Sequence, residues 1–322
     1  MSYDFAVPTA THLPLDMSTP SVPLSVLLAL DGSRPSESAA RVTLELAERR
    51  MALVQVLQII DTRPVPIPPP LDVALAVADS AYGEAIQEER QLVVSSTLER
   101  LLGKEVSWPV AIKLGQPSHV ILQEALQQGA TLITVGLRHH GAVERATHND
   151  TVHEILRATT IPVLAVTEQQ RTLPHHVVVG MDFSRASIDA ARVALTLMGD
   201  GGTMTLAYVA PAFAFGIEEG EQLIRQLGVA AAFEKVHASL APSHGIAIDD
   251  VILDGTLTRN IAATLRAHVD SVNADLVALG ARRHGRLERW IVGSVTADFT
   301  REGRHSLLAV PAMDQSAPTA TS

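Results

Sequence analysis

The chain has 322 residues, a formal net charge of −10 and no cysteine. The absence of cysteine excludes disulfide bonds, thiolate metal sites and cysteine nucleophiles. The excess of acidic residues argues against a surface that coats nucleic acid, because such a surface needs clustered Lys and Arg. The length suits two domains of about 150 residues each. A composition with 47% hydrophobic but only 3% aromatic residues is typical of parallel sheets buried beneath helices.

The first residues contain Asp4 and Pro8 and lack a basic segment followed by an apolar stretch, so we expect no secretory signal. No apolar run approaches the ~18–20 residues that a membrane span requires. The sequence therefore predicts a cytoplasmic protein that binds neither membrane nor nucleic acid.

In the first half, short apolar runs alternate with segments in which apolar residues recur at helical spacing. The predicted elements are, in chain order, strand Val26–Leu30, helix Ser36–Arg49, strand Leu53–Ile60, a helix within Leu71–Leu102, strand Val106–Leu114, helix Pro117–Gln128, strand Thr131–Val135, a helix near Asp150–Ala158 and strand Pro162–Val166.

The second half repeats this order. Its predicted elements are strand Val177–Gly180, helix Ala186–Leu197, strand Met204–Val209, helix Glu218–Leu240, strand Ile246–Leu253, helix Leu257–Val269, strand Leu276–Leu279, helix Ser294–Arg301 and strand Leu307–Val310. Strands that alternate with helices indicate right-handed crossovers and a parallel sheet. Each half is thus predicted to be a doubly wound α/β domain.

The two halves also share sequence. Asp31–Leu46 and Asp182–Leu197 agree at 10 of 16 positions with an offset of 151. A second match, at an offset of 144, pairs ATLITVGLRHHGAVER (130–145) with ADLVALGARRHGRLER (274–289), and VLAV (163–166) with LLAV (307–310). A pattern of this length indicates duplication of a whole domain.

The domain limits follow from the repeat. We expect a disordered tail at 1–20, a first domain at 21–167, a linker at 168–174, a second domain at 175–312 and a disordered tail at 313–322. The first half is longer between the two matching blocks, and the extra residues are placed in 63–102, which opens with RPVPIPPP.

Ligands of an open parallel sheet bind beyond the carboxyl ends of its strands, where the strand order reverses. The first such place is the turn after the first strand of each half, Asp31-Gly32-Ser33 and Asp182-Phe183-Ser184. Each Asp is a candidate acceptor for a ribose hydroxyl or an adenine amine, and a purely structural turn is the alternative. Helix capping is favoured for the serines Ser33, Ser36, Ser184 and Ser187.

The second place is the loop after the fourth strand. In the second half, Gly280-Ala-Arg-Arg-His-Gly285 is followed by Gly293-Ser294 at the start of a helix. Glycine permits close backbone approach, and a helix N-terminus offers free N–H groups to a phosphate. Arg282 and Arg283 can add bidentate phosphate contacts.

These turns and loops together resemble the universal stress protein family, and the resemblance covers nearly all of both halves. It implies a five-stranded parallel sheet with helices on both faces in each half, the adenine nucleotide alpha hydrolase-like fold. ATP-binding members carry G-x-x-G-x9-G-(S/T) after the fourth strand. By this resemblance the nucleotide-binding candidates of the second half are Asp182, Val209 (opposite adenine), Gly280, Arg282, Arg283 (at the second glycine position), Gly293, Ser294 and Val295.

The first half departs further from the motif. Its weaker candidates are Asp31, Gly32, Ile59 and Gly136. His139 replaces the second glycine, and Asn149-Asp150 stand in place of Gly-Ser. The Asp150 carboxylate would repel phosphate oxygens, so we expect the second half to bind nucleotide better.

Four histidines of the first half, His139, His140, His148 and His153, raise the possibility of a zinc site. The spacing of His148 and His153 does not suit two ligands on adjacent helical turns, and no acidic cluster accompanies them. A solvated loop without metal is therefore preferred.

The resemblance implies a stress-response protein that binds ATP or a related adenine nucleotide, with or without Mg²⁺. The alternative is a nucleotide-independent interaction protein with degenerate phosphate loops. An enzyme is not expected, because neither a Ser-Gly-Gly-x-Asp-Ser loop nor a nucleophile–base pairing is present, although slow ATP hydrolysis is left open. The family further implies that the final strands of the halves pair, that the chain forms a homodimer, and that it acts on a protein partner not identified by the sequence.

Overall fold

The computed structural model describes residues 24–61, 80–138, 151–210, 219–241, 244–255, 260–281 and 293–311. Domain 1 contains β1 (Ser25–Leu30), α1 (Arg34–Arg50), β2 (Leu53–Asp61), α3 (Ser80–Leu102), β3 (Val110–Gly115), α4 (Pro117–Gln127), β4 (Leu132–Gly136), α5 (Thr151–Ala158) and β5 (Val163–Val166). Domain 2 contains β6 (His176–Met181), α6 (Arg185–Leu197), β7 (Thr203–Ala210), α7 (Glu219–Ser239), β8 (Ala247–Asp254), α8 (Ile261–Ser271), β9 (Leu276–Ala281), α9 (Ser294–Glu302) and β10 (Ser306–Pro311). No helix within these ranges has the length and apolarity needed to cross a membrane.

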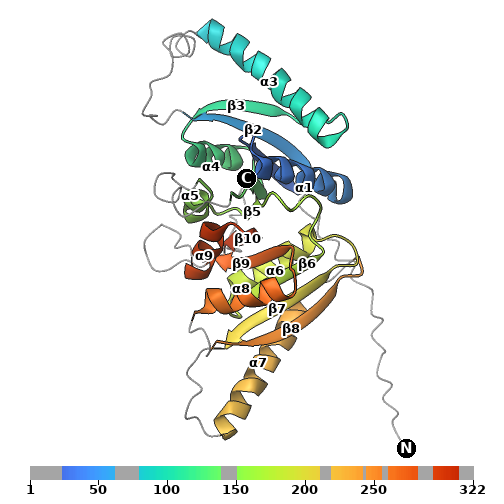
Figure 1. The fold of residues 1–322 in the computed structure, drawn as a ribbon, viewed down its shortest axis with the longest axis vertical. Coiled ribbons are helices and arrows are strands. Elements are labelled where there is room, and N and C mark those ends of the chain that lie inside the picture. The colour runs from blue at the N-terminus through green and yellow to red at the C-terminus, as the bar shows by residue number, and fades with distance from the viewer. Residues whose placement is uncertain are drawn as a thin grey trace, which may run out of the picture.

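The strands form one ten-stranded sheet in the order β3-β2-β1-β4-β5-β10-β9-β6-β7-β8. Within each domain all five strands are parallel, and the order places β1 or β6 in the middle, as a doubly wound sheet requires. The sheet runs through the long axis of the molecule, with α3 and α7 at opposite ends (Figure 1). The predicted fold class is confirmed.

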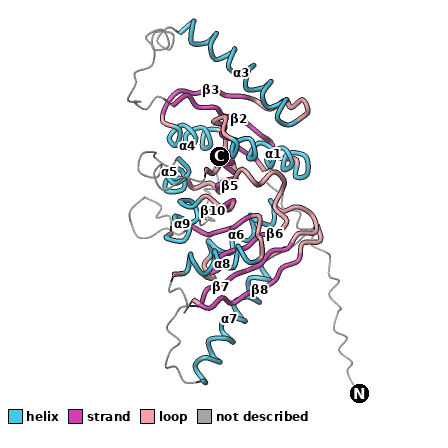
Figure 2. The backbone as a smooth tube through the Cα atoms, viewed as in Figure 1, coloured by secondary structure: helices cyan, strands magenta, loops and turns pink. Residues whose placement is uncertain are grey.

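Helices cover both faces of this sheet (Figure 2). Because side chains alternate along a strand, neighbouring residues of β1 enter different cores: Val26 and Leu28 face one cluster, whereas Leu27 and Ala29 face the other. The first cluster is closed by α1, α3, α6 and α7. The second is closed by α4, α5, α8 and α9. The apolar runs of the strands therefore follow from burial on both sides.

The domains meet where β5 and β10 pair in antiparallel orientation, with Leu307 opposite Ala165, Leu308 opposite Leu164 and Ala309 opposite Val163. These are the two strands that the family resemblance places together. The pairing reverses the strand direction between the domains, so the carboxyl edge of domain 1 lies beside the amino edge of domain 2.

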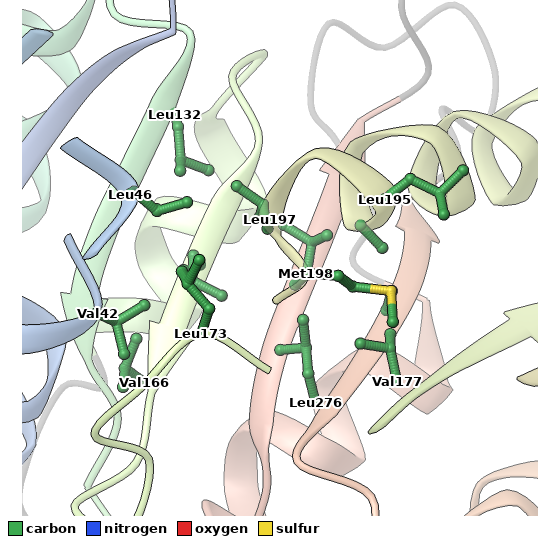
Figure 3. Packing of buried hydrophobic residues seen from close by; sticks show 14 of the residues in the cluster. Val42, Leu46, Leu132, Val166, Leu173, Val177, Leu195, Leu197, Met198 and Leu276 are labelled. Atoms are coloured by element: carbon green, nitrogen blue, oxygen red, sulfur yellow. The ribbon is translucent and has the colours of Figure 1, made fainter. Parts of the chain in front are cut away.

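The segment expected to be a linker is anchored between the domains. Leu173 is fully buried in the core cluster that continues from Val42 and Leu46 to Leu197 (Figure 3). Its amide also donates to the carboxylate of Glu45 at 2.6 Å. The two halves of the core are thus joined by a buried side chain.

Some element ends differ from the sequence predictions. Helix α1 begins at Arg34 rather than Ser36, because Ser33 caps it and Pro35 is tolerated in a first turn. Strand β3 begins after Pro109, later than the predicted Val106. Helix α8 begins at Ile261 with the side chain of Asn260 as its cap. In each case a capping residue or a proline sets the limit.

Two glycines allow helices to press against strand ends. A Cβ at Gly136, the last residue of β4, would lie 2.5 Å from the amide nitrogen of Ser36. A Cβ at Gly280 would lie 2.4 Å from the carbonyl carbon of Ala186. The first turns of α1 and α6 therefore require glycine at these positions to pack on the sheet.

We expect Gly280→Ala to destabilise the protein by about 1–3 kcal/mol, because the added methyl meets backbone that cannot move aside cheaply. The control is Gly228→Ala in α7, where a Cβ meets no atom within 4 Å and alanine should stabilise the helix by about 1 kcal/mol. Urea denaturation measures both. Equal stability of the two variants would contradict the packing role.

Candidate functional site

The carboxyl ends of β9, β6 and β7 bring the predicted residues of domain 2 to one edge. The register of β6 with β7 ends at Met181 opposite Tyr208, and that with β9 ends at Gly180 opposite Leu279. Asp182 follows β6, so it lies between the strand ends that carry Val209 and Gly280. Ile59, Asp31 and Gly136 occupy the corresponding strand ends of domain 1. Strand order reverses at these points, which makes them the expected ligand edge.

The turn after the first strand of each domain is built by hydrogen bonds. The amide of Ser184 donates to Oδ1 of Asp182 at 2.9 Å, and the amide of Ser33 donates to Asp31 at the same distance. The hydroxyl groups of Ser33 and Ser184 cap α1 and α6. Capping by these two serines is confirmed, and both Asp residues are exposed at the edge.

Ser36 and Ser187, the other two serines considered for capping, lie in the first turns of the helices. Each donates its hydroxyl to the carbonyl oxygen of the capping serine, at 2.8 Å and 2.9 Å. They support the caps from within the helix.

The second residue of the turn has positive φ in both domains, 75° at Gly32 and 58° at Phe183. This region suits glycine and costs a bulky residue about 1–2 kcal/mol. The ring of Phe183 lies 5.1 Å from that of Tyr208 and 5.0 Å from that of Phe233. These aromatic contacts offset the strain and fix the turn that presents Asp182.

Within the described residues, helix α9 begins without a side-chain cap: its N-cap is Gly293, and no described side chain accepts from its first amides. Helix α4 also lacks such a cap, whereas α1, α6 and α8 each have one. A Cβ at Gly293 would meet nothing within 4 Å of the described structure, so packing does not demand glycine there. Ser294 is exposed and Val295 half-buried. Arg282 and Arg283 lie outside the described residues.

Val209 and Ile59 lie on the strands beside the two Asp turns. Val209 is buried and packs in the core, while Ile59 is half-buried. A Cβ at Gly255 would lie 2.4 Å from the carbonyl oxygen of Ala210 and 3.1 Å from the side chain of Val209. Gly255 was not among the sequence candidates, and Gly115 at the end of β3 is its counterpart, with φ of 145°.

The Asp of domain 1 has a charged partner. The guanidinium of Arg138, which follows β4, binds Oδ2 of Asp31 at 2.7 Å. Partial desolvation of the carboxylate raises the pKa of Asp31, although the residue reaches solvent, but hydrogen bonds from Ser33 and the positive charge of Arg138 outweigh it and hold the pKa below its usual 3.8. The carboxylate that the resemblance assigns to a nucleotide is therefore already paired.

Domain 1 also contains a hydrogen-bonded group of polar side chains that no sequence motif indicates. A pocket of about 580 Å³ lies between α4 and α5. At its wall the hydroxyl of buried Ser118 donates to Glu154 at 2.6 Å, and Gln116 donates to the same oxygen at 3.2 Å. Because Glu154 lies in the first turn of α5, this carboxylate adds negative charge near the helix that follows β4.

The metal hypothesis concerns four histidines of domain 1, most of which lie outside the described residues. His139, His140 and His148 lie outside the described residues, and only His153, in α5, lies within them. Within the described ranges no three His, Asp or Glu side chains are grouped to hold a metal ion. The preference for a loop without metal stays a prediction.

The chain matches the model of the universal stress protein family twice, over residues 24–167 and 174–311. The chain belongs to the universal stress protein family. It is 26% identical over 144 residues to universal stress protein YxiE of Bacillus subtilis (strain 168), an alignment that covers 44% of this chain and 97% of that protein. The relative is thus the length of one of the two domains.

Solved structures of double length share the fold of this universal stress protein. A universal stress protein from Archaeoglobus fulgidus DSM 4304 superimposes with a TM-score of 0.63 at 18% identity, covering 90% of this chain and 98% of that one. A functionally unknown protein from Pseudomonas aeruginosa PAO1 gives a TM-score of 0.52 at 13% identity, covering 89% and 92%. At these identities the likeness establishes the fold alone.

The ion pair of Asp31 can be tested by a carboxyl NMR titration of the universal stress protein. The Asp31 pKa should lie below 3.8 and should rise in Arg138→Gln, because a nearby positive charge favours the carboxylate. Any stability from Asp31 is present above its unfolded pKa and is lost as pH falls through the lower folded pKa. Arg100→Gln, at an exposed position of α3, is the control. An unchanged Asp31 pKa in Arg138→Gln would disprove the pairing.

The strain at Phe183 predicts an inverted order of stability. Phe183→Ala loses the ring contacts and keeps positive φ, so it should cost about 2 kcal/mol. Phe183→Gly loses the same contacts but relieves the backbone, so it should be more stable than Phe183→Ala by about 1 kcal/mol. Chemical denaturation of both variants measures the difference. A less stable glycine variant would show that the turn is unstrained.

Proposed function

We propose that this universal stress protein binds one adenine nucleotide, ATP or a close relative, at the carboxyl edge of domain 2. The observation that carries the proposal is the start of α9 at Gly293, which no side chain of the described residues caps, in a helix that follows the strand beside Asp182. Helix α9 runs back from the carboxyl edge to the start of β10, so its N-terminus lies at the ligand edge.

The chemistry of this edge suits a nucleotide. The amides of the first turn of α9 and the hydroxyl of Ser294 would donate to phosphate oxygens, where the positive end of the helix dipole favours negative charge. Gly293 leaves room for a phosphate to approach the backbone. Asp182 would accept from the ribose or the adenine amine. Arg282, Arg283 and a Mg²⁺ ion would complete neutralisation of the phosphates.

Domain 1 is proposed not to bind nucleotide. In its sequence Asn149-Asp150 replace Gly-Ser, and the Asp150 carboxylate would repel phosphate oxygens. The protein would then sense nucleotide with domain 2 and use domain 1 as its scaffold, acting in the cytoplasmic stress response through a protein partner, as a homodimer, rather than by catalysis. The proposal thus assigns nucleotide binding to domain 2 and leaves domain 1 with the nucleotide-independent role.

Isothermal titration calorimetry with ATP and Mg²⁺ tests the proposal. We expect one site per chain and loss of binding by at least about tenfold in Gly293→Asp, because the new carboxylate meets the phosphates at the helix N-terminus. Gly228→Asp is the control, since its glycine is equally open but lies on α7 across the sheet.

Two results would contradict the proposal. Absence of heat with the wild-type protein would favour the nucleotide-independent function. Unchanged affinity in Gly293→Asp would place the nucleotide elsewhere.

A further inference from the structure

A second pocket, of about 460 Å³, lies at the junction of the domains and does not depend on the proposed nucleotide site. It is lined from domain 1 by the start of α1, the end of β4 and the residues after β5. From domain 2 it is lined by Gly303 and Arg304, between α9 and β10. This volume is in the range of small-molecule sites.

Three arginines from three separate segments line this pocket: Arg34, Arg138 and Arg304. Arg34 binds the carboxylate of Glu168 at 3.0 Å, and Arg138 binds Asp31 at 2.7 Å. Within the described structure no acidic group pairs with Arg304, which is exposed. Among the residues that the structure describes, the junction therefore keeps one positive charge without an acidic partner, and its guanidinium groups have further N–H donors to offer a ligand.

The surroundings add to the positive character of the pocket. Helix α1 begins at Arg34, so the positive end of its dipole opens here. The floor is formed by buried residues, Leu137, Gly303 and Thr167, and the Thr167 hydroxyl lies 3.2 Å from that of Ser306. The floor of the pocket is thus part of the β5–β10 junction, while its charged side chains lie at the solvent-exposed mouth.

One arginine of the pocket already binds a carboxylate. Glu168 places one carboxylate oxygen on Arg34, and its own carbonyl oxygen accepts from the buried Ser38 hydroxyl at 2.8 Å, which fixes the residue beside the helix start. A ligand with more oxygens than a carboxylate can bridge Arg34 to Arg304 or Arg138. Guanidinium groups bind phosphate with paired N–H donors.

We propose that this junction pocket binds the phosphate group of a small phosphorylated metabolite, held by Arg34 and Arg304 from the two domains. Glu168 acts as an internal competitor that occupies Arg34 when the ligand is absent. The ligand would thereby add a contact across the domain junction.

The duplicated half lacks this combination. At the offset of 144, Thr160 corresponds to Arg304 and Ala312 corresponds to Glu168, whereas at the offset of 151 Arg185 corresponds to Arg34. The pocket is therefore predicted on one side of the repeat only, and Arg185 supplies a control with the same local position on its helix.

The test is an amide NMR titration with inorganic phosphate and, separately, with glycerol 3-phosphate, against sodium chloride at equal ionic strength. The titrations use the Gly293→Asp protein, in which the proposed nucleotide site carries a carboxylate. Phosphate should shift the amides of Thr167, Gly303 and Arg304. Arg304→Gln and Arg34→Gln should each weaken binding about tenfold, because each removes a charge-assisted contact, whereas Arg185→Gln should leave it unchanged.

Removal of the internal competitor should act in the opposite sense. Glu168→Gln should tighten phosphate binding several-fold, while Glu99→Gln, exposed on α3, should not. Tighter binding of glycerol 3-phosphate than of phosphate supports a metabolite, and equal binding supports the phosphate group alone as the ligand. Shifts no larger than those in chloride, or equal losses in Arg304→Gln and Arg185→Gln, would overturn the proposal without bearing on the nucleotide site.

Discussion

Three residue pairs of β5 and β10 connect two parallel sheets into one. Their antiparallel pairing sets the strand direction of one domain relative to the other. Since the pairing is antiparallel, the ligand edge of one domain faces away from that of the other. Leu173 enters the shared core at the same junction, and the hydroxyl groups of Thr167 and Ser306 meet there. A change in this pairing would shift the carboxyl edges of the two domains relative to each other. It would also separate the residues that line the pocket between the domains.

On this common frame the two copies have diverged at their ligand edges. Gly136 and Gly280 both allow the first turn of a helix to pack closely on a strand end. Their presence in both copies is therefore explained by packing and is not evidence for a ligand. The difference in sequence lies in charge: Asn149-Asp150 of domain 1 stand where domain 2 has Gly293-Ser294 at the start of α9. Because the fold is duplicated, domain 1 can serve as a scaffold while domain 2 keeps the proposed binding site.

Much of this architecture could be predicted from the sequence. The order of short apolar runs and helical segments follows from burial, and the repeat at Asp31 and Asp182 follows from duplication. The capping roles of Ser33 and Ser184 were equally readable. The positive φ of Phe183, the contact of Arg138 with Asp31 and the burial of Leu173 were not. Each depends on atoms brought together from distant parts of the chain, which no local pattern records.

The central claim is that only domain 2 offers a nucleotide edge. Amide chemical shifts of the wild-type protein during titration with ATP and Mg²⁺ test it most directly. The account predicts saturable shifts at Asp182, Ser294 and Val295, with the amides of Ile59 and Gly115, at the ends of β2 and β3 and away from the junction pocket, unmoved. Saturable shifts confined to the carboxyl edge of domain 1 would contradict it.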